Sequence, residues 1–401
     1  ACAASTSWSA TPTASPPPSC AASTCAGPRP RASAWSTPSA ARTSRCARCS
    51  SPSPGDPYRV SRSLSLEFGF VATVGPSARP RVDELQRAAE AAAERSRHPH
   101  ALALIPALSG VAMFLEGRFH EALPLLTEGE RQLRTRCVGV SWETGSTLTF
   151  LLWSLWWSGD YRTFCARAPA IIREAEERGD RYLATNLCSG YANAIWLVAD
   201  DPATAEARAA SAIGPWSRGG SHLQHFHDVV ARVHTDLYRG DGAAAYRHIT
   251  AGWQSLDDSL SLRIQVVRIT CEYLRGAAAL AASEHEVDPA PLLHVVTRAA
   301  KRLEGERVAW ATPLAALLRA GARARDGERG TRVTSLLEEV ARGASAAGMA
   351  GYAAAARWAL GRMREGSDGE ALVAAAEAEL AERGVKAPAR FAGMLAPGFE
   401  D

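Results

Sequence analysis

The chain has 401 residues, of which 46% are apolar, and its formal net charge is +3. That length suits either two or three ordinary domains or one repeat array. Residues 1–55 contain five arginines and no acidic residue, so the rest of the chain is slightly acidic and lacks the basic stripe that nucleic-acid binding needs.

Composition also bears on where the protein works. No apolar run approaches the roughly 20 residues of a membrane span, and the first residues lack the basic-then-apolar pattern of a signal peptide. We therefore expect a cytoplasmic protein with neither a membrane nor a nucleic-acid partner. Lysine occurs only at Lys301 and Lys386, and the abundance of Ala, Gly and Pro indicates a GC-rich bacterial gene. Since no initiator Met is present, we expect a fragment of a longer protein.

Residues 1–55 form a low-complexity segment rich in Ser, Pro, Ala, Arg and Cys, with no Leu, Ile or Phe. So little apolar surface cannot offset the entropy of ordering, which predicts disorder. A GC-rich gene read out of frame gives the same kind of text, and both interpretations stay open. Two cysteine pairs suggest a zinc site, but their Pro-rich flanks disfavour it. The pairs are Cys20 with Cys25 and Cys46 with Cys49.

Beyond this segment, one short motif returns at steps of about 40 to 42 residues. A glycine ends one helix, an aromatic residue packs between two helices, and a small residue lets the second helix approach, as is typical of a helical hairpin. Hairpins at a fixed period stack into a solenoid, so residues 56–385 are predicted to be an all-α, tetratricopeptide-like helical-hairpin solenoid. The motif stands at Gly117-Arg118-Phe119, Gly159-Asp160-Tyr161, Asp200-Asp201-Pro202 and Gly240-Asp241-Gly242.

Helical periodicity continues through this region, and no stretch alternates with period two for long enough to predict a strand. We expect about eight helical pairs, and a C-terminal tail outside the array at residues 386–401. In chain order the pairs are 58–71 with 83–97, 101–116 with 120–134, 142–158 with 161–178, 182–198 with 203–213, 222–239 with 243–256, 260–282 with 291–303, 308–325 with 331–347, and 352–363 with 369–383.

The helix expected at 142–158 holds three tryptophans, which suit either an aromatic binding platform or the core. Trp153 and Trp157 share one face at the i,i+4 spacing, while Trp156 points elsewhere, so no side of this helix is polar. Because large aromatic side chains are most often buried, we predict that all three belong to the core.

Three polar residues interrupt the apolar helix expected at 182–198, namely Asn186, Tyr191 and Asn193. Inside a buried helix they must find hydrogen-bond partners. They either bond to neighbouring helices, the slightly favoured alternative for any single residue, or they line the inner surface, where a ligand would lie.

Histidines are densest at the start of the helix expected at 222–239. His222 and His225 lie one turn apart, which suits a pair of metal ligands, but a third ligand is missing and His227 faces away. We predict no metal and expect solvent-facing or groove-lining histidines, while a metal-binding protein built on this pair stays an alternative. Because first helices form the inner surface of a hairpin array, the candidate partner-facing residues are Asn186, Tyr191, Asn193, His222, His225 and His227.

Catalytic motifs are missing from the sequence. It has no phosphate-binding loop, nucleophile elbow, HExxH helix or kinase catalytic loop. We therefore predict no enzyme activity, no cofactor and no catalytic residue. Four isolated cysteines, predicted to be free buried thiols, are Cys137, Cys165, Cys188 and Cys271.

Three stretches carry a family resemblance: 55–60 (GDPYRV), 222–226 (HLQHF) leading into 236–241 (DLYRGD), and 388–399 (PARFAGMLAPGF). In this order and spacing they resemble the C-terminal helical-repeat region of large bacterial serine/threonine protein kinases. In that family a kinase domain precedes an AAA/STAND-type ATPase and a tetratricopeptide-like array. The family would have ATPase-linked helices where residues 1–55 stand, which favours the out-of-frame interpretation of that segment.

The resemblance implies a non-catalytic sensor or scaffold region whose partner is a protein, a peptide, or the parent protein's own kinase and ATPase domains. No kinase or ATPase residue carries over, because none of those motifs is present. Partner binding on the concave face would bias a packed interface and so release or restrain the catalytic head. The repeat region of a STAND-type transcription regulator or of a cyclase is the alternative.

Overall fold

Helices account for all the regular structure in the residues that the computed structural model describes, so the all-α prediction is confirmed for that part of the chain. Predictions for residues 1–54 and for His222 lie outside it. The described residues are 55–214, 216, 223–328 and 330–399.

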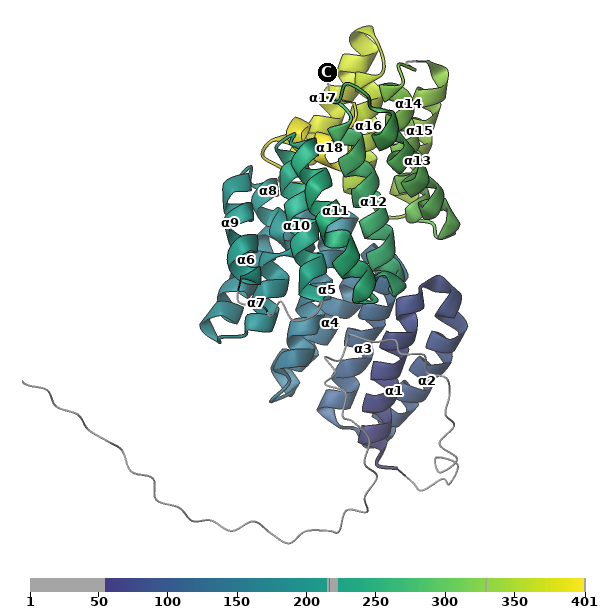
Figure 1. Cartoon of the computed structure of the whole chain (residues 1–401). Helices are drawn as coiled ribbons and strands as arrows, with labels where there is room; N and C mark the ends of the chain where they lie inside the picture. The colour runs from purple at the N-terminus through teal and green to yellow at the C-terminus, as the bar shows by residue number, and fades with distance from the viewer. Residues whose placement is uncertain (1–54, 215, 217–222, 329, 400–401) are drawn as a thin grey trace, which may run out of the picture.

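Consecutive helices pack side by side along the chain, from the purple N-terminal end to the yellow C-terminal end of Figure 1. In chain order the helices are α1 (Pro57–Val71), α2 (Arg79–Ser96), α3 (Pro99–Leu115), α4 (Phe119–Arg136), α5 (Ser141–Ser158), α6 (Tyr161–Glu177), α7 (Arg181–Cys188), α8 (Ala194–Val198), α9 (Pro202–Ile213), α10 (Leu223–Tyr238), α11 (Gly242–Asp258), α12 (Gln265–Ala282), α13 (Ala290–Gly305), α14 (Ala311–Arg325), α15 (Thr331–Ala346), α16 (Ala350–Arg362), α17 (Gly366–Glu382) and α18 (Pro388–Leu395). Short 3-10 segments are η1 (Ala72–Val74), η2 (Pro76–Ala78), η3 (Gly190–Asn193) and η4 (Ser261–Arg263).

In the repeated Gly-Asp pair, the glycine ends one helix and the aspartate caps the next helix. Gly159 and Gly240 have φ of +77° and +75°, the left-handed conformation that ends a helix without steric strain. Asp160 and Asp241 then accept hydrogen bonds from the amide three residues further on, at 3.1 and 2.8 Å, and so cap the next helix. At the slot without a glycine, Asp200 itself adopts a φ of +56°.

The two helices of a hairpin differ in burial. The first helices, such as α3, α5, α12 and α16, are buried around most of their circumference. The second helices, such as α4, α6, α13 and α15, are buried along one face. The first helices therefore form the inner layer of the array, and the second helices form its outer layer.

One predicted helix is interrupted. The stretch 182–198 divides into α7, η3 and α8, because Ser189 is extended and Gly190 has a φ of +60°. The interruption frees the carbonyl group of Cys188, which accepts a hydrogen bond of 2.9 Å from the side-chain amide of Asn193. Asn193, which the sequence places inside one long helix, thus donates a side-chain hydrogen bond to the carbonyl at the end of the shorter helix α7.

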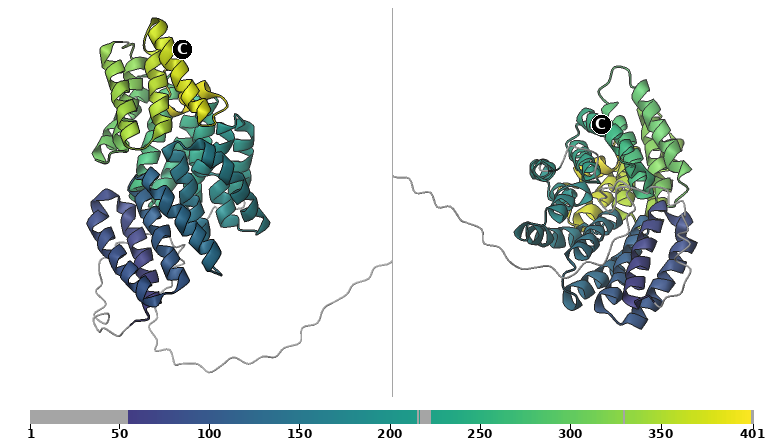
Figure 2. Two further views of the ribbon diagram at one scale, coloured as in Figure 1. Left: turned by 180° about the vertical axis from the view of Figure 1, so that it is seen from behind. Right: turned by 60° about the horizontal axis from the view of Figure 1, so that its bottom comes forward.

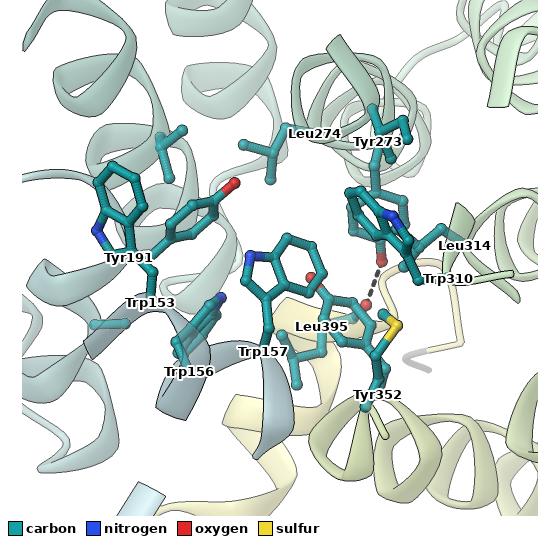
Figure 3. Packing of buried hydrophobic residues seen from close by; sticks show 14 of the residues in the cluster. Trp153, Trp156, Trp157, Tyr191, Tyr273, Leu274, Trp310, Leu314, Tyr352 and Leu395 are labelled. Carbon is teal, nitrogen blue, oxygen red and sulfur yellow. Dashed lines mark hydrogen bonds between the residues drawn. The ribbon is translucent and has the colours of Figure 1, made fainter. Parts of the chain in front are cut away.

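Helices far apart in the chain meet inside the array. Trp157 on α5 stacks on Tyr352 of α16, with ring centroids 5.5 Å apart, and its ring centroid lies 5.2 Å from that of Trp310, next to α14. Figure 3 shows these rings converging from separate helices. The inner side, which an open array would leave for a ligand, is filled here by the chain's own aromatic side chains.

Residues 386–401, predicted as a tail outside the array, fold back into it as far as they are described. Helix α18 packs against α10, α16 and α17, and in the right-hand view of Figure 2 the yellow segment lies between helices of the other colours. Phe391 is fully buried, with its ring centroid 5.9 Å from that of Trp156. The hydroxyl of Tyr273 donates a hydrogen bond to the carbonyl of Leu395 (Figure 3). The described part of this segment is apolar and packs into the array rather than extending away from it.

Candidate functional site

The candidate partner-facing residues are mostly interior. Asn186, Tyr191, Asn193 and His227 are each no more than 2% exposed. His225 is half-buried on α10, and His222 lies outside the described residues. Because packed helices enclose the first four from all sides, these residues do not form a surface that a partner could contact.

Hydrogen bonds within the array hold most of the buried polar side chains on α7 and η3, while Oδ1 of Asn193 has no partner among the described residues. The hydroxyl groups of Tyr191 and Thr270 lie 2.5 Å apart, joining η3 to α12. The amide of Gln224 donates to the side-chain oxygen of Asn186 at 3.3 Å, joining α10 to α7. These are the local bonds between neighbouring helices that the sequence offered as the alternative to ligand contacts.

Replacing Asn193 tests that structural role. The Asn193→Ala variant should lose about 1–3 kcal/mol of stability, because two buried carbonyl groups would lose a donor. Urea denaturation of the purified variants measures the effect. Gln254→Ala on the exposed face of α11 is the matched control, expected within about 0.5 kcal/mol of the parent. Equal stability of both variants would contradict the assignment.

Two histidines are sealed in the aromatic interior. The ring centroid of His227 lies 5.0 Å from that of Trp153, and that of His234 lies 5.4 Å from that of Trp156. Burial lowers the pKa of His227 to about 3 and that of His234 to about 4. Both rings are therefore neutral at physiological pH. Neither nitrogen of His227 has a hydrogen-bond partner among the described residues.

The tryptophan prediction is confirmed, and the cysteine prediction holds in part. Trp153, Trp156 and Trp157 are 6%, 1% and 1% exposed. All four described cysteines are free, but only two of them are fully buried. Burial raises the pKa of the Cys188 thiol to about 11, so this group is not a ready nucleophile.

An apolar groove lies on the surface of the N-terminal hairpins, between α1, α3 and α5. Its volume is about 270 Å³. Phe70 is 44% exposed and Trp142 is 40% exposed, although both are large apolar side chains. We call this feature the apolar groove; its main lining residues are Leu66, Phe70, Leu108, Val111, Trp142 and Phe150.

A second depression adjoins the apolar groove and is polar. It has a volume of about 480 Å³, and Arg62 lines both depressions, so they meet at this side chain. Trp142 and Glu143, adjacent residues of α5, line the groove and the second depression respectively. We call the second feature the polar hollow; its polar and charged side chains are Tyr58, Arg62, His98, His100, Arg136 and Glu143, and the thiol of Cys137 also lines it.

Three side chains of the polar hollow form a connected row. The hydroxyl of Tyr58 lies 2.9 Å from Nδ1 of His100, and Nε2 of His100 lies 3.3 Å from Oε1 of Glu143. Contact with His100 holds the pKa of Glu143 below its usual range, so this carboxylate is ionised. A neutral His100 with its proton on Nε2 accepts from the phenol through Nδ1, while Nε2 lies close to Glu143 without forming a hydrogen bond among the described residues.

Two further groups of the hollow keep free hydrogen-bond donors. Arg136, the last residue of α4, is exposed and makes no hydrogen bond or ion pair within the described residues. In His98, Nδ1 accepts a hydrogen bond from the backbone N–H of His100 at 3.2 Å. The proton of a neutral His98 ring therefore sits on Nε2, which becomes a donor.

Sequence reasoning missed both depressions. Phe150 fits the apolar periodicity of its helix, and Phe70 stands in a short apolar run beside Phe68 and Val71, so both look like ordinary core residues. Tyr58, His98 and Glu143 stand in three separate segments, and their proximity depends on how α1, α3 and α5 pack. The one available signal was the pair of histidines at residues 98 and 100, at the start of α3.

Other classes of site find no support in the described part of the chain. No group of three or more His, Cys, Asp or Glu side chains is placed to hold a metal ion there. None of the helices in the described ranges has the length and apolar character needed to cross a membrane. Comparison of the chain with protein-family models, with curated proteins and with solved structures gave no match.

Proposed function

We propose that this chain is a non-catalytic, protein-binding scaffold with a tetratricopeptide-like array, and that it binds a partner through the apolar groove. The observation that carries the proposal is the exposure of Phe70 and Trp142 around a concave apolar surface. Exposed aromatic side chains that line a depression are typical of protein-binding sites, because a partner's apolar side chain removes them from water.

The groove is favoured over the inner side of the array as the binding surface. Trp157, Trp310 and Tyr352 already fill the inner side, so a partner could enter only by unpacking the core. The groove needs no such rearrangement. Its size suits one or two large side chains of a helical or extended segment.

The motifs at residues 55–60 and 388–399 support a regulatory setting. We propose that the parent is a bacterial signalling protein, a serine/threonine kinase with an ATPase module, and that the array serves as its sensor region. Partner binding at the groove would then act on the head through the packing of the N-terminal hairpins. A STAND-type transcription regulator or a cyclase is the alternative parent.

Selection from a peptide library tests the groove. Random 16-residue peptides displayed on phage are selected on the full chain, and enriched peptides are synthesised and measured by fluorescence polarisation. We expect peptides whose affinity falls at least tenfold on Phe70→Ala/Trp142→Ala, because two aromatic contacts are removed. Thermal unfolding of the double variant checks that it is folded.

Val287→Ala is the matched control, because Val287 is a fully exposed apolar residue between α12 and α13. Selected peptides should bind this variant as tightly as the parent. If no peptide is enriched, or if every enriched peptide ignores the groove variant, the proposed binding site is wrong.

A further inference from the structure

The polar hollow points to the chemistry of the partner, and the inference rests on the binding function proposed for the apolar groove. Because Arg62 lines both depressions, a segment seated in the groove passes the mouth of the hollow. Trp142 and Glu143 are consecutive on α5, so the two depressions lie within a few residues' reach of one bound chain.

The polar hollow contains more positively charged groups and hydrogen-bond donors than acidic groups to pair with them. Its one carboxylate, Glu143, already has two neighbours: Nε2 of His100 at 3.3 Å and a guanidinium nitrogen of Arg62 at 4.0 Å. Arg136 forms no ion pair among the described residues and interacts with Glu128 only at longer range. Nε2 of His98 makes no hydrogen bond there. The hollow thus has a surplus of donors and positive charge.

An acceptor with negative charge fits this surplus best. A guanidinium binds a carboxylate in a planar, two-pronged arrangement, and a neighbouring imidazole N–H can add a third hydrogen bond. The row from Tyr58 through His100 to Glu143 fixes the wall of the hollow. Glu143 lies beside His100 and Arg62 and forms no ion pair with Arg136 among the described residues.

We propose that the polar hollow binds an aspartate or glutamate side chain of the same peptide segment whose apolar residue fills the groove. The ligand is therefore a peptide with an aromatic or large aliphatic residue a few positions from an acidic one. Residues 1–54 of the chain do not meet this description, because they contain arginines and no acidic residue. The occupant is therefore a segment of a separate partner protein.

A double-mutant cycle on the full chain tests the proposal with the peptides selected for the groove. We expect these peptides to carry Asp or Glu beside the apolar anchor. Changing that residue to Asn or Gln should weaken binding about tenfold, and Arg136→Ala should weaken the acidic peptide by a similar factor. The two changes together should weaken binding no more than either one alone.

Arg342→Ala on α15, an exposed arginine distant from α4 in the chain, is the control and should leave binding unchanged. Raising NaCl from about 50 mM to about 500 mM should shrink the effect of Arg136→Ala, since salt screens an exposed charge pair. Groove-dependent peptides without an acidic preference, or with affinities that ignore Arg136→Ala, overturn this inference and leave the groove intact. A selection without any groove-dependent peptide overturns both proposals.

Discussion

A chain that ends at Val385 should unfold at least about 10 °C below the full chain, or fail to fold. The lost segment places four large apolar side chains in the core, each no more than 4% exposed. Burial of each contributes about 1.5–3 kcal/mol, and in an array of this size 1 kcal/mol corresponds to roughly 1.5 °C. The four are Phe391, Met394, Leu395 and Phe399. Circular dichroism during heating measures the midpoint.

Two substitutions at neighbouring positions test whether the loss of stability comes from lost core packing or from the shorter chain. Phe391→Ala should lose about 3–5 kcal/mol, because it opens a cavity beside Trp156. Arg390→Ala should lose less than about 1 kcal/mol, because its ion pair with Asp200 is largely exposed. A truncated chain that melts within about 2 °C of the full chain would show that the segment is a dispensable tail after all.

Stability should fall steeply as the pH drops from about 6.5 towards 4. The pKa values of the buried His227 and His234, about 3 and about 4, lie below the value of about 6.5 expected in the unfolded chain. Between these limits the unfolded chain binds more protons, so protonation favours unfolding. The contribution is fully present above pH 6.5 and is lost as the pH falls, by up to about 1.4 kcal/mol per pH unit for each ring.

Urea denaturation at pH 7.5, 6.0, 5.0 and 4.5 measures this dependence. The His227→Phe/His234→Phe variant keeps two aromatic rings but cannot take up a proton, so its stability should change less with pH than that of the parent. His285→Gln, in the exposed connection before α13, should keep the parent's pH dependence. Parallel curves for the parent and the double variant would mean that other groups control the acid response.

Much of the helical framework follows from local sequence, because helix ends are chemically marked. The pairs Gly159-Asp160 and Gly240-Asp241 combine a left-handed residue with a capping carboxylate, and both helix ends fall where these pairs predict them. The interruption at Ser189 is different. The interrupted conformation is stabilised partly by α9. The side-chain amide of Asn193 donates to the carbonyl of Ala205 on that helix at 2.8 Å, and this bond can form only when α9 is in place.

The candidate site depends on tertiary contacts that local patterns do not encode. His227 looks like a surface residue in sequence, but Trp153, more than seventy positions earlier, covers it. Conversely, Phe70 looks like a core residue, yet no helix among the described residues covers it fully. Periodicity tells which side of a helix is apolar, and it does not tell whether another helix packs there.

Contacts between helices that are far apart in the chain bear on how the protein folds during synthesis. In an open stack each hairpin is complete once its neighbour has formed. Here the packing of Trp156 and Trp157 is completed only by Phe391 and Tyr352, which leave the ribosome roughly two hundred residues later. At about 5–20 residues per second, that delay is on the order of ten to forty seconds. We expect that during this interval part of the apolar surface of the tryptophan-rich helix α5 stays accessible to water.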